Sequence, residues 1–234
     1  AYVLDATPDF KWQWQRLRAL DLDLQLGGVF LTHAHVGHYT GLINLGREIM
    51  GAKNIPVYAM PRMKSYLETN GPWSQLVTDN NIDLHQMTSE QPITLSPSLK
   101  VTPFLVPHRD EFSETVGYKI AGPNKTALFI PDIDKWDKWE KDIVGEIKQV
   151  DYAFLDATFY SGKEINNRDI SQIPHPFIIE SFEKFIGLSR DERSKIVFIH
   201  FNHTNPVIDP ESPEAKQVIE QGFNIGQIRE VYNL

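Results

Sequence analysis

Thr32-His33-Ala34-His35-Val36-Gly37-His38 is the stretch that decides the fold and chemistry of this chain. It follows the apolar run Val29-Phe30-Leu31 and precedes an expected helix beginning near Tyr39. Alternate side chains of extended backbone share a face, so His33 and His35 are expected to point into one cavity, and a turn into the helix lets His38 approach from the side. Imidazole nitrogens bind zinc and other transition metals. The stretch therefore predicts a metal-dependent enzyme, the alternative being a surface loop that is merely rich in histidine.

Composition limits the expected binding partners and the residue types that could hold a metal. The chain has 234 residues with 23 Lys and Arg against 31 Asp and Glu, a net charge of -8, so no nucleic acid is expected as a partner unless a local basic groove exists. The 41% hydrophobic content supports a sizeable core, and without a linker or repeat we predict a single domain over 1–234. No membrane-spanning stretch or signal peptide is visible, which predicts a soluble protein, cytoplasmic or exported, of unknown oligomeric state. With no cysteine, any metal must be held by His and carboxylates.

Hydrophobic periodicity predicts alternating strands and helices, hence an α/β fold. The 80–97 stretch is expected to be a hairpin or loop insertion rather than a crossover helix. The chain begins at Ala1 directly before a strand-like segment, as a trimmed or processed product would. The expected strands are 2–4, 29–32, 57–60, 101–106, 115–121, 126–130, 152–156, 196–200 and, less clearly, 228–232, and the expected helices are 9–21, 41–50, 61–69, 135–149, 176–186 and 213–221.

Three further candidate ligands follow expected strands. His108, Asp132 and His200 each stand at or just after a strand end, where a rigid scaffold aims functional side chains, so they are expected to converge with the histidine stretch. Each also has an ordinary interpretation. A single histidine after a strand is often a hydrogen-bonded structural residue, and Asp132 could cap a following helix. Taken together, they favour a metal site.

These residues resemble the ligand set of the metallo-β-lactamase-fold hydrolases. His33-x-His35-x-x-His38, then His108, Asp132 and His200, occur in the order of that family and with similar intervals, over nearly the whole chain. The resemblance implies an αββα sandwich with a one- or two-metal site along the sheet edges. The family's first motif, a strand ending in Asp, corresponds here to Val3-Leu4-Asp5, and two strands usually precede it. Their absence here predicts trimmed amino-terminal strands, with an open sheet edge or upstream sequence that pairs there.

Longer phrases resemble the group around the pyrroloquinoline quinone biosynthesis protein B. In that group the first motif lacks some of the histidines, whereas this chain has all three, which predicts a relative rather than the biosynthetic protein itself. The phrases are Leu4-Asp5-Ala6-Thr7-Pro8-Asp9, Gly37-His38-Tyr39-Thr40-Gly41-Leu42, Val106-Pro107-His108-Arg109-Asp110-Glu111 and His200-Phe201-Asn202-His203-Thr204-Asn205-Pro206.

Gly37 departs from the family motif His-x-His-x-Asp-His, because it stands where the motif has Asp. In two-metal members that carboxylate binds the second metal and helps to hold the attacking water. The resemblance implies a complete first site of His33, His35 and His108. It leaves a weakened second site of His38, Asp132 as a bridging ligand, and His200. We therefore expect one tight zinc and a second, labile one, with iron or manganese as alternatives.

The resemblance also implies residues that support the chemistry. His175 corresponds by position to the downstream catalytic histidine of the ribonuclease Z branch, and would give a proton to the leaving group unless it is an ordinary loop histidine. Asp5 and Asp156 are expected to orient metal ligands, although both could equally be strand-end turn residues. His203 is expected to orient a metal ligand, with a ligand or a structural residue as the alternatives. Arg109 is expected to bind a phosphate or carboxylate of the substrate, or else to pair with its acidic neighbours.

Three functions are compatible with this sequence. The first is a metal-dependent hydrolase that uses a metal-bound hydroxide on an ester, amide or phosphodiester of a small or modest-sized substrate. The second is an iron-dependent, oxygenase-like enzyme related to quinone cofactor biosynthesis. The third is a catalytically silent metal-binding protein, which the glycine at position 37 makes conceivable.

Overall fold

The computed structural model describes residues 1–165 and 169–234, which divide into two compact units. The first unit contains Ala1–Gln91 and Asp110–Val116, and the second contains Pro92–Arg109 and Gly117–Leu234. Each unit has its own hydrophobic core. In the described part of the chain, no helix has the length and apolar character that crossing a membrane requires.

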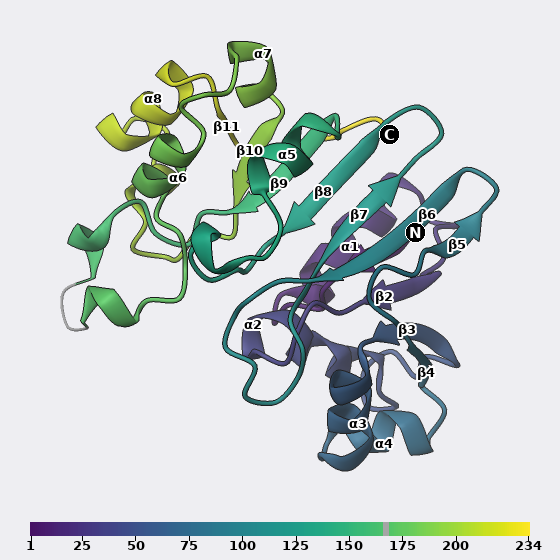
Figure 1. The fold of residues 1–234 in the computed structure, drawn as a ribbon. Coiled ribbons are helices and arrows are strands. Elements are labelled where there is room, and N and C mark those ends of the chain that lie inside the picture. The colour runs from purple at the N-terminus through teal and green to yellow at the C-terminus, as the bar shows by residue number, and fades with distance from the viewer. Residues whose placement is uncertain (166–168) are drawn as a thin grey trace. The chain divides into compact units, whose positions relative to one another are not determined.

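The first unit is built on a parallel four-stranded sheet in the order β1-β2-β3-β4 (Figure 1). Phe10 and Trp14 are buried on one face of the first helix, which packs in the core with residues of β2 and β3. β1 lies at the edge of the sheet and pairs with β2 alone among the described strands. The elements are β1 (Tyr2–Leu4), α1 (Phe10–Leu20), β2 (Gly28–Phe30), α2 (Val36–Tyr39), β3 (Ile55–Ala59), α3 (Pro61–Thr69), α4 (Trp73–Thr78) and β4 (Ile82–Gln86).

The second unit is built on a mixed seven-stranded sheet in the order β11-β10-β9-β8-β7-β6-β5. Strands β8 to β11 are parallel, β7 and β8 are antiparallel, and so are β5 and β6. Figure 1 shows helices α6 to α8 beside the β9–β11 side of this sheet. The elements are β5 (Ile93–Ser96), β6 (Leu99–Leu105), β7 (Val116–Ala121), β8 (Thr126–Ile130), α5 (Ile143–Lys148), β9 (Tyr152–Asp156), α6 (Ile178–Lys184), α7 (Arg190–Arg193), β10 (Ile196–Ile199), α8 (Pro213–Glu220) and β11 (Asn224–Ile225).

Most expected elements are present, and four expectations need correction. The expected helix 41–50 is a 3-10 helix over Thr40–Leu45 followed by turns. Its tight entry requires Gly41, since a Cβ there would lie 2.0 Å from the carbonyl oxygen of Thr7. The expected helix 135–149 is two shorter segments, a 3-10 turn at Trp136–Lys138 and α5.

The other two corrections concern strands. The 80–97 stretch forms no helix, as expected, but it is not a hairpin, because β4 pairs with β3 in one sheet while β5 pairs with β6 in the other. Residues 228–232 form no strand, and the sheet ends instead with β11. Tyr232 there packs edge-on against Tyr152 and Phe154, with ring centroids 5.2 and 4.9 Å apart, so side-chain packing determines the path of this segment.

Candidate metal centre

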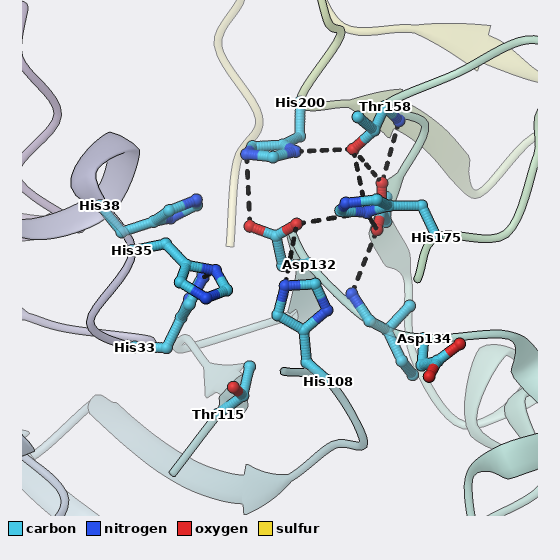
Figure 2. Close-up of polar contacts among 12 residues, drawn as sticks. His33, His35, His38, His108, Thr115, Asp132, Asp134, Thr158, His175 and His200 are labelled. Carbon is cyan, nitrogen blue, oxygen red and sulfur yellow. Dashed lines mark hydrogen bonds and ion pairs between the residues drawn. The ribbon is translucent and has the colours of Figure 1, made fainter. Parts of the chain in front are cut away.

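The first unit brings the three histidines of the opening motif together. His33 and His35 lie on the irregular segment after β2, and His38 lies on α2. Nε2 of His33 is 2.8 Å from Nδ1 of His35, and the His33 and His38 rings are 4.2 Å apart (Figure 2). His33 and His38 are buried, at 1% and 5% exposure. The expected convergence of His33 and His35 and the lateral approach of His38 are therefore present within this unit.

Asp5 and Thr32 hold these rings from behind. Asp5 is buried at the end of β1, where its carboxylate lies 2.7 Å from Nδ1 of His38 and accepts from the backbone N–H of Thr32, also at 2.7 Å. The Thr32 hydroxyl donates to Asp5 and lies 2.9 Å from Nδ1 of His33. Nδ1 of His33 and Nδ1 of His38 thus each lie against a protein oxygen, which fixes the planes of these two rings and leaves their Nε2 atoms facing away.

In the second unit the candidate ligands surround Asp132, which follows β8 and is only 3% exposed. Its carboxylate oxygens lie 3.8 Å from Nε2 of His108, 3.4 Å from Nε2 of His200 and 3.3 Å from Nδ1 of His175 (Figure 2). His108 comes from the loop after β6 and His200 from the residue after β10. The strand-end argument is therefore met within this sheet, because the alternate strands β6, β8 and β10 deliver these side chains to one place.

His175 is held by a second buried carboxylate. Nδ1 of His175 lies 2.8 Å from Asp156, which is fully buried at the end of β9. Burial of the ring lowers the pKa of His175, but the charge and hydrogen bond of Asp156, assisted by the charge of Asp132, raise it by more. The pKa of His175 therefore lies above its usual value. An ionised carboxylate can only accept, so Nδ1–H donates to Asp156 and Nε2 is the remaining exchangeable position.

Thr158 is a part of this network that the sequence did not single out. Its hydroxyl donates to Asp156 at 2.7 Å and lies 3.0 Å from Nδ1 of His200 and 3.2 Å from Nδ1 of His175. It stands two residues after Asp156, and this proximity in the chain was the available signal. Thr32 and Thr158 therefore occupy equivalent roles in the two units, each linking a buried aspartate to histidine rings.

The donor set of the second unit fits a divalent transition metal. His108, Asp132 and His175 each offer one ligand atom, and these atoms lie within 4.8 Å of one another. The same is true of Asp132, Asp156 and His200. Mixed imidazole and carboxylate donors suit zinc, iron and manganese. His175, expected as a proton donor, thus also stands among possible ligands.

Two other expected residues differ in their surroundings. Arg109 lines a cavity of about 560 Å³ in the second unit together with His175, Thr158 and Phe159. His203 is exposed on the turn after β10. The arginine is therefore positioned beside candidate catalytic groups.

Comparisons with known proteins agree on the family. The profile of the β-lactamase superfamily domain matches residues 1–201. A coenzyme PQQ synthesis protein B from Xanthomonas campestris pv. campestris is 25% identical over 248 aligned positions, covering 95% of this chain and 80% of the relative.

Two solved structures extend this similarity to the fold. Zn(2+)-bound PqqB from Methylobacterium extorquens has a TM-score of 0.79 at 21% identity, covering 96% of this chain and 81% of that one. A diphosphatase of the PhnP family has a TM-score of 0.64 at 20% identity, covering 96% and 77%. With the profile match over most of its length and these shared folds, the chain belongs to the β-lactamase superfamily, has the metallo-β-lactamase fold and is related to the coenzyme PQQ synthesis proteins B.

Proposed function

We propose that this protein is a metal-dependent hydrolase that cleaves an ester, amide or phosphodiester bond. The observation that carries the proposal is the environment of Asp132, a buried carboxylate with nitrogens of His108, His175 and His200 within 3.8 Å. A buried carboxylate is costly unless its charge is compensated, and a bound divalent cation would compensate the charge of Asp132 while binding His108 and His200.

The proposed ligands are those expected from the sequence. His33, His35 and His108 would hold a tight metal, and His38, Asp132 and His200 a labile one, with Asp132 as a ligand common to both. Zinc is the proposed metal, supported by the zinc in the related PqqB structure, and iron or manganese remain alternatives for the same donors. Position 37 lacks the carboxylate of the family motif, which is the reason for proposing unequal affinities.

Different residues of the two units would have different roles in hydrolysis. A bound divalent metal would supply an acidified water, with a pKa lowered to about 7, and would polarise the scissile bond. Asp156 would hold Nδ1–H of His175, so that Nε2 of this ring carries the proton for the leaving group. Asp5 and Thr32 would keep the rings of His33 and His38 in their ligating orientations.

Arg109 would bind an anionic group of the substrate, since it lines the same cavity as His175. A cavity of about 560 Å³ suits a small or modest-sized molecule. The PhnP-family diphosphatase, which shares the fold, supports testing phosphodiesters first.

The test begins with protein purified without added metal. Elemental analysis should find about one tightly held equivalent after dialysis, and two equally tight equivalents would contradict the proposal. The wild type is then compared with His33→Ala on bis-p-nitrophenyl phosphate, a lactone and a β-lactam. Hydrolysis of at least one substrate that His33→Ala loses supports the proposal, and no difference on any of them would instead favour a silent metal-binding protein.

Iron chemistry is the second candidate, and the relatedness to coenzyme PQQ synthesis proteins favours including it. His and Asp donors are suitable ligands for Fe(II) as well as for zinc. Anaerobic purification followed by oxygen-electrode measurements separates the two functions. Bound iron with oxygen consumption and no hydrolysis would replace the hydrolase proposal.

A further inference from the structure

We infer that Glu111 is a positioning residue that orients His35 as a metal ligand, and that α3 holds Glu111 in place through Arg62. This rests on the proposed function only in taking His33 and His35 to be metal ligands. All the contacts involved lie within the first unit.

The two nitrogens of His35 have different partners. Nε2 lies 3.1 Å from a carboxylate oxygen of Glu111, and Nδ1 lies 2.8 Å from Nε2 of His33. A carboxylate accepts the Nε2–H proton, so Nδ1 is left with the lone pair that a metal requires. On the other ring, Nδ1 of His33 faces the Thr32 hydroxyl. Each ring therefore has one nitrogen against a protein oxygen and directs its other nitrogen at the same point.

The loop that carries Glu111 is fastened at several points. The Arg62 guanidinium donates to the carbonyl oxygens of Asp110 at 2.8 Å and of Glu111 at 3.4 Å. In the opposite direction, the Glu114 carboxylate accepts from the backbone N–H of Arg62 in the first turn of α3. The Ser113 hydroxyl accepts from the backbone N–H of Ala34, between the two histidines, at 2.8 Å. The loop thus connects α3 to the histidine motif itself.

Glu111 is about half exposed, at 47% for its side chain, and His35 is at 21%. An ion pair of such exposure contributes little to folding stability, so its removal should leave the fold intact. Its effect on ring orientation should instead appear in metal affinity. Residues that hold a ligating histidine typically change metal affinity by about 10- to 100-fold when they are removed.

The experiment measures Co(II) and Zn(II) affinity and the visible spectrum of the Co(II) form in Glu111→Ala, Glu111→Gln and wild type. We expect affinity for the first equivalent to fall about 10- to 100-fold in Glu111→Ala, with an altered Co(II) spectrum. Glu111→Gln should lose less, because the amide oxygen still accepts from Nε2–H without the charge. Arg62→Ala should show a smaller loss of the same kind.

Asp83→Asn is the matched control. Asp83 and His85 form a similar pair in the same unit, with Nε2 of His85 2.9 Å from the carboxylate, but both are exposed and neither is a proposed ligand. This variant should bind cobalt as the wild type does. Glu111→Ala with wild-type affinity and spectrum would overturn the inference while leaving the proposed function intact. A wild type that binds no cobalt or zinc would overturn both, so the two failures are distinguishable.

Discussion

Two pairs of an aspartate and a threonine lie behind the candidate metal ligands. In the first unit the pair is Asp5 and Thr32, and in the second it is Asp156 and Thr158. In each pair the hydroxyl donates to the carboxylate and also lies beside a histidine nitrogen. A buried polar network of this kind orients rings firmly only when all of its members are satisfied.

Asp156→Asn tests how much one such carboxylate contributes to folding stability. Its oxygens face the backbone N–H groups of Ile133 and Thr158, the Thr158 hydroxyl and Nδ1 of His175. The NH2 group of the asparagine would face buried N–H and O–H donors and leave them without an acceptor. We therefore expect the free energy of unfolding, measured by urea denaturation, to fall by about 1–3 kcal/mol. Asp151→Asn, whose exposed carboxylate accepts from the backbone of Thr126, is the control and should lose less. Equal losses would contradict this assignment.

Gly37→Asp tests the weakened second site. A Cβ at this position meets nothing within 4 Å, so the backbone there has room for a side chain to begin. We expect a second metal equivalent to survive dialysis in this variant, measured by elemental analysis. Gly187→Asp places an acid at a second position where a Cβ meets open space, and should leave the metal content unchanged. Unchanged metal content in Gly37→Asp would argue against His38, Asp132 and His200 as a site limited by that missing carboxylate.

Helices α8 and α1 differ in the capping of their N-termini. α8 has Ser212 as its N-cap, accepting from the backbone N–H of Ala215 at 3.0 Å, and Pro213 as its first residue. α1 is preceded by Asp9, which forms no side-chain capping bond. We expect Ser212→Ala to lower the free energy of unfolding by about 1 kcal/mol and Asp9→Ala to change it by less than about 0.5 kcal/mol. Similar urea midpoints for the two variants would contradict this.

The elements that the sequence predicted well are those determined by local pattern. Helices at 9–21 and 61–69 and the central strands follow apolar periodicity, and the strand ends then placed His108, Asp132 and His200 correctly within their sheet. The continuous helix expected at 135–149 does not form, because the indoles of Trp136 and Trp139 donate hydrogen bonds to different segments. Trp136 donates to the Ser181 hydroxyl, and Trp139 to the carbonyl oxygen of Leu105.

The missed site residues have the same explanation. Thr32, Glu111 and Thr158 act through contacts that only folding creates, Glu111 meeting a histidine 76 positions earlier in the chain. Short motifs specify ligands by residue type and spacing, whereas the oxygen atoms that orient those ligands come from whichever segment lies behind them. A single sequence carries little signal for such contacts.

For the molecule as a whole, a metal that binds only the folded state should raise its stability. Zinc at about 100 times its dissociation constant would contribute about 2.7 kcal/mol, which corresponds to a rise in Tm of roughly 5–10 °C for a chain of this size. We expect differential scanning calorimetry to show this rise over chelator-treated protein, and to show much less in His33→Ala. A wild-type Tm that is the same with zinc and with chelator would contradict the proposed metal dependence.

His200 and Asp5 adopt left-handed backbone conformations, with φ of 64° and 60°. For a residue with a Cβ this geometry costs of order 1–3 kcal/mol, and glycine would avoid it. At position 200 the substitution that relaxes the backbone is also the one that deletes the imidazole beside Asp132. Selection of variants for thermal stability alone would therefore favour glycine at position 200, which removes a proposed metal ligand. Engineering for thermal stability would have to keep His200 unchanged.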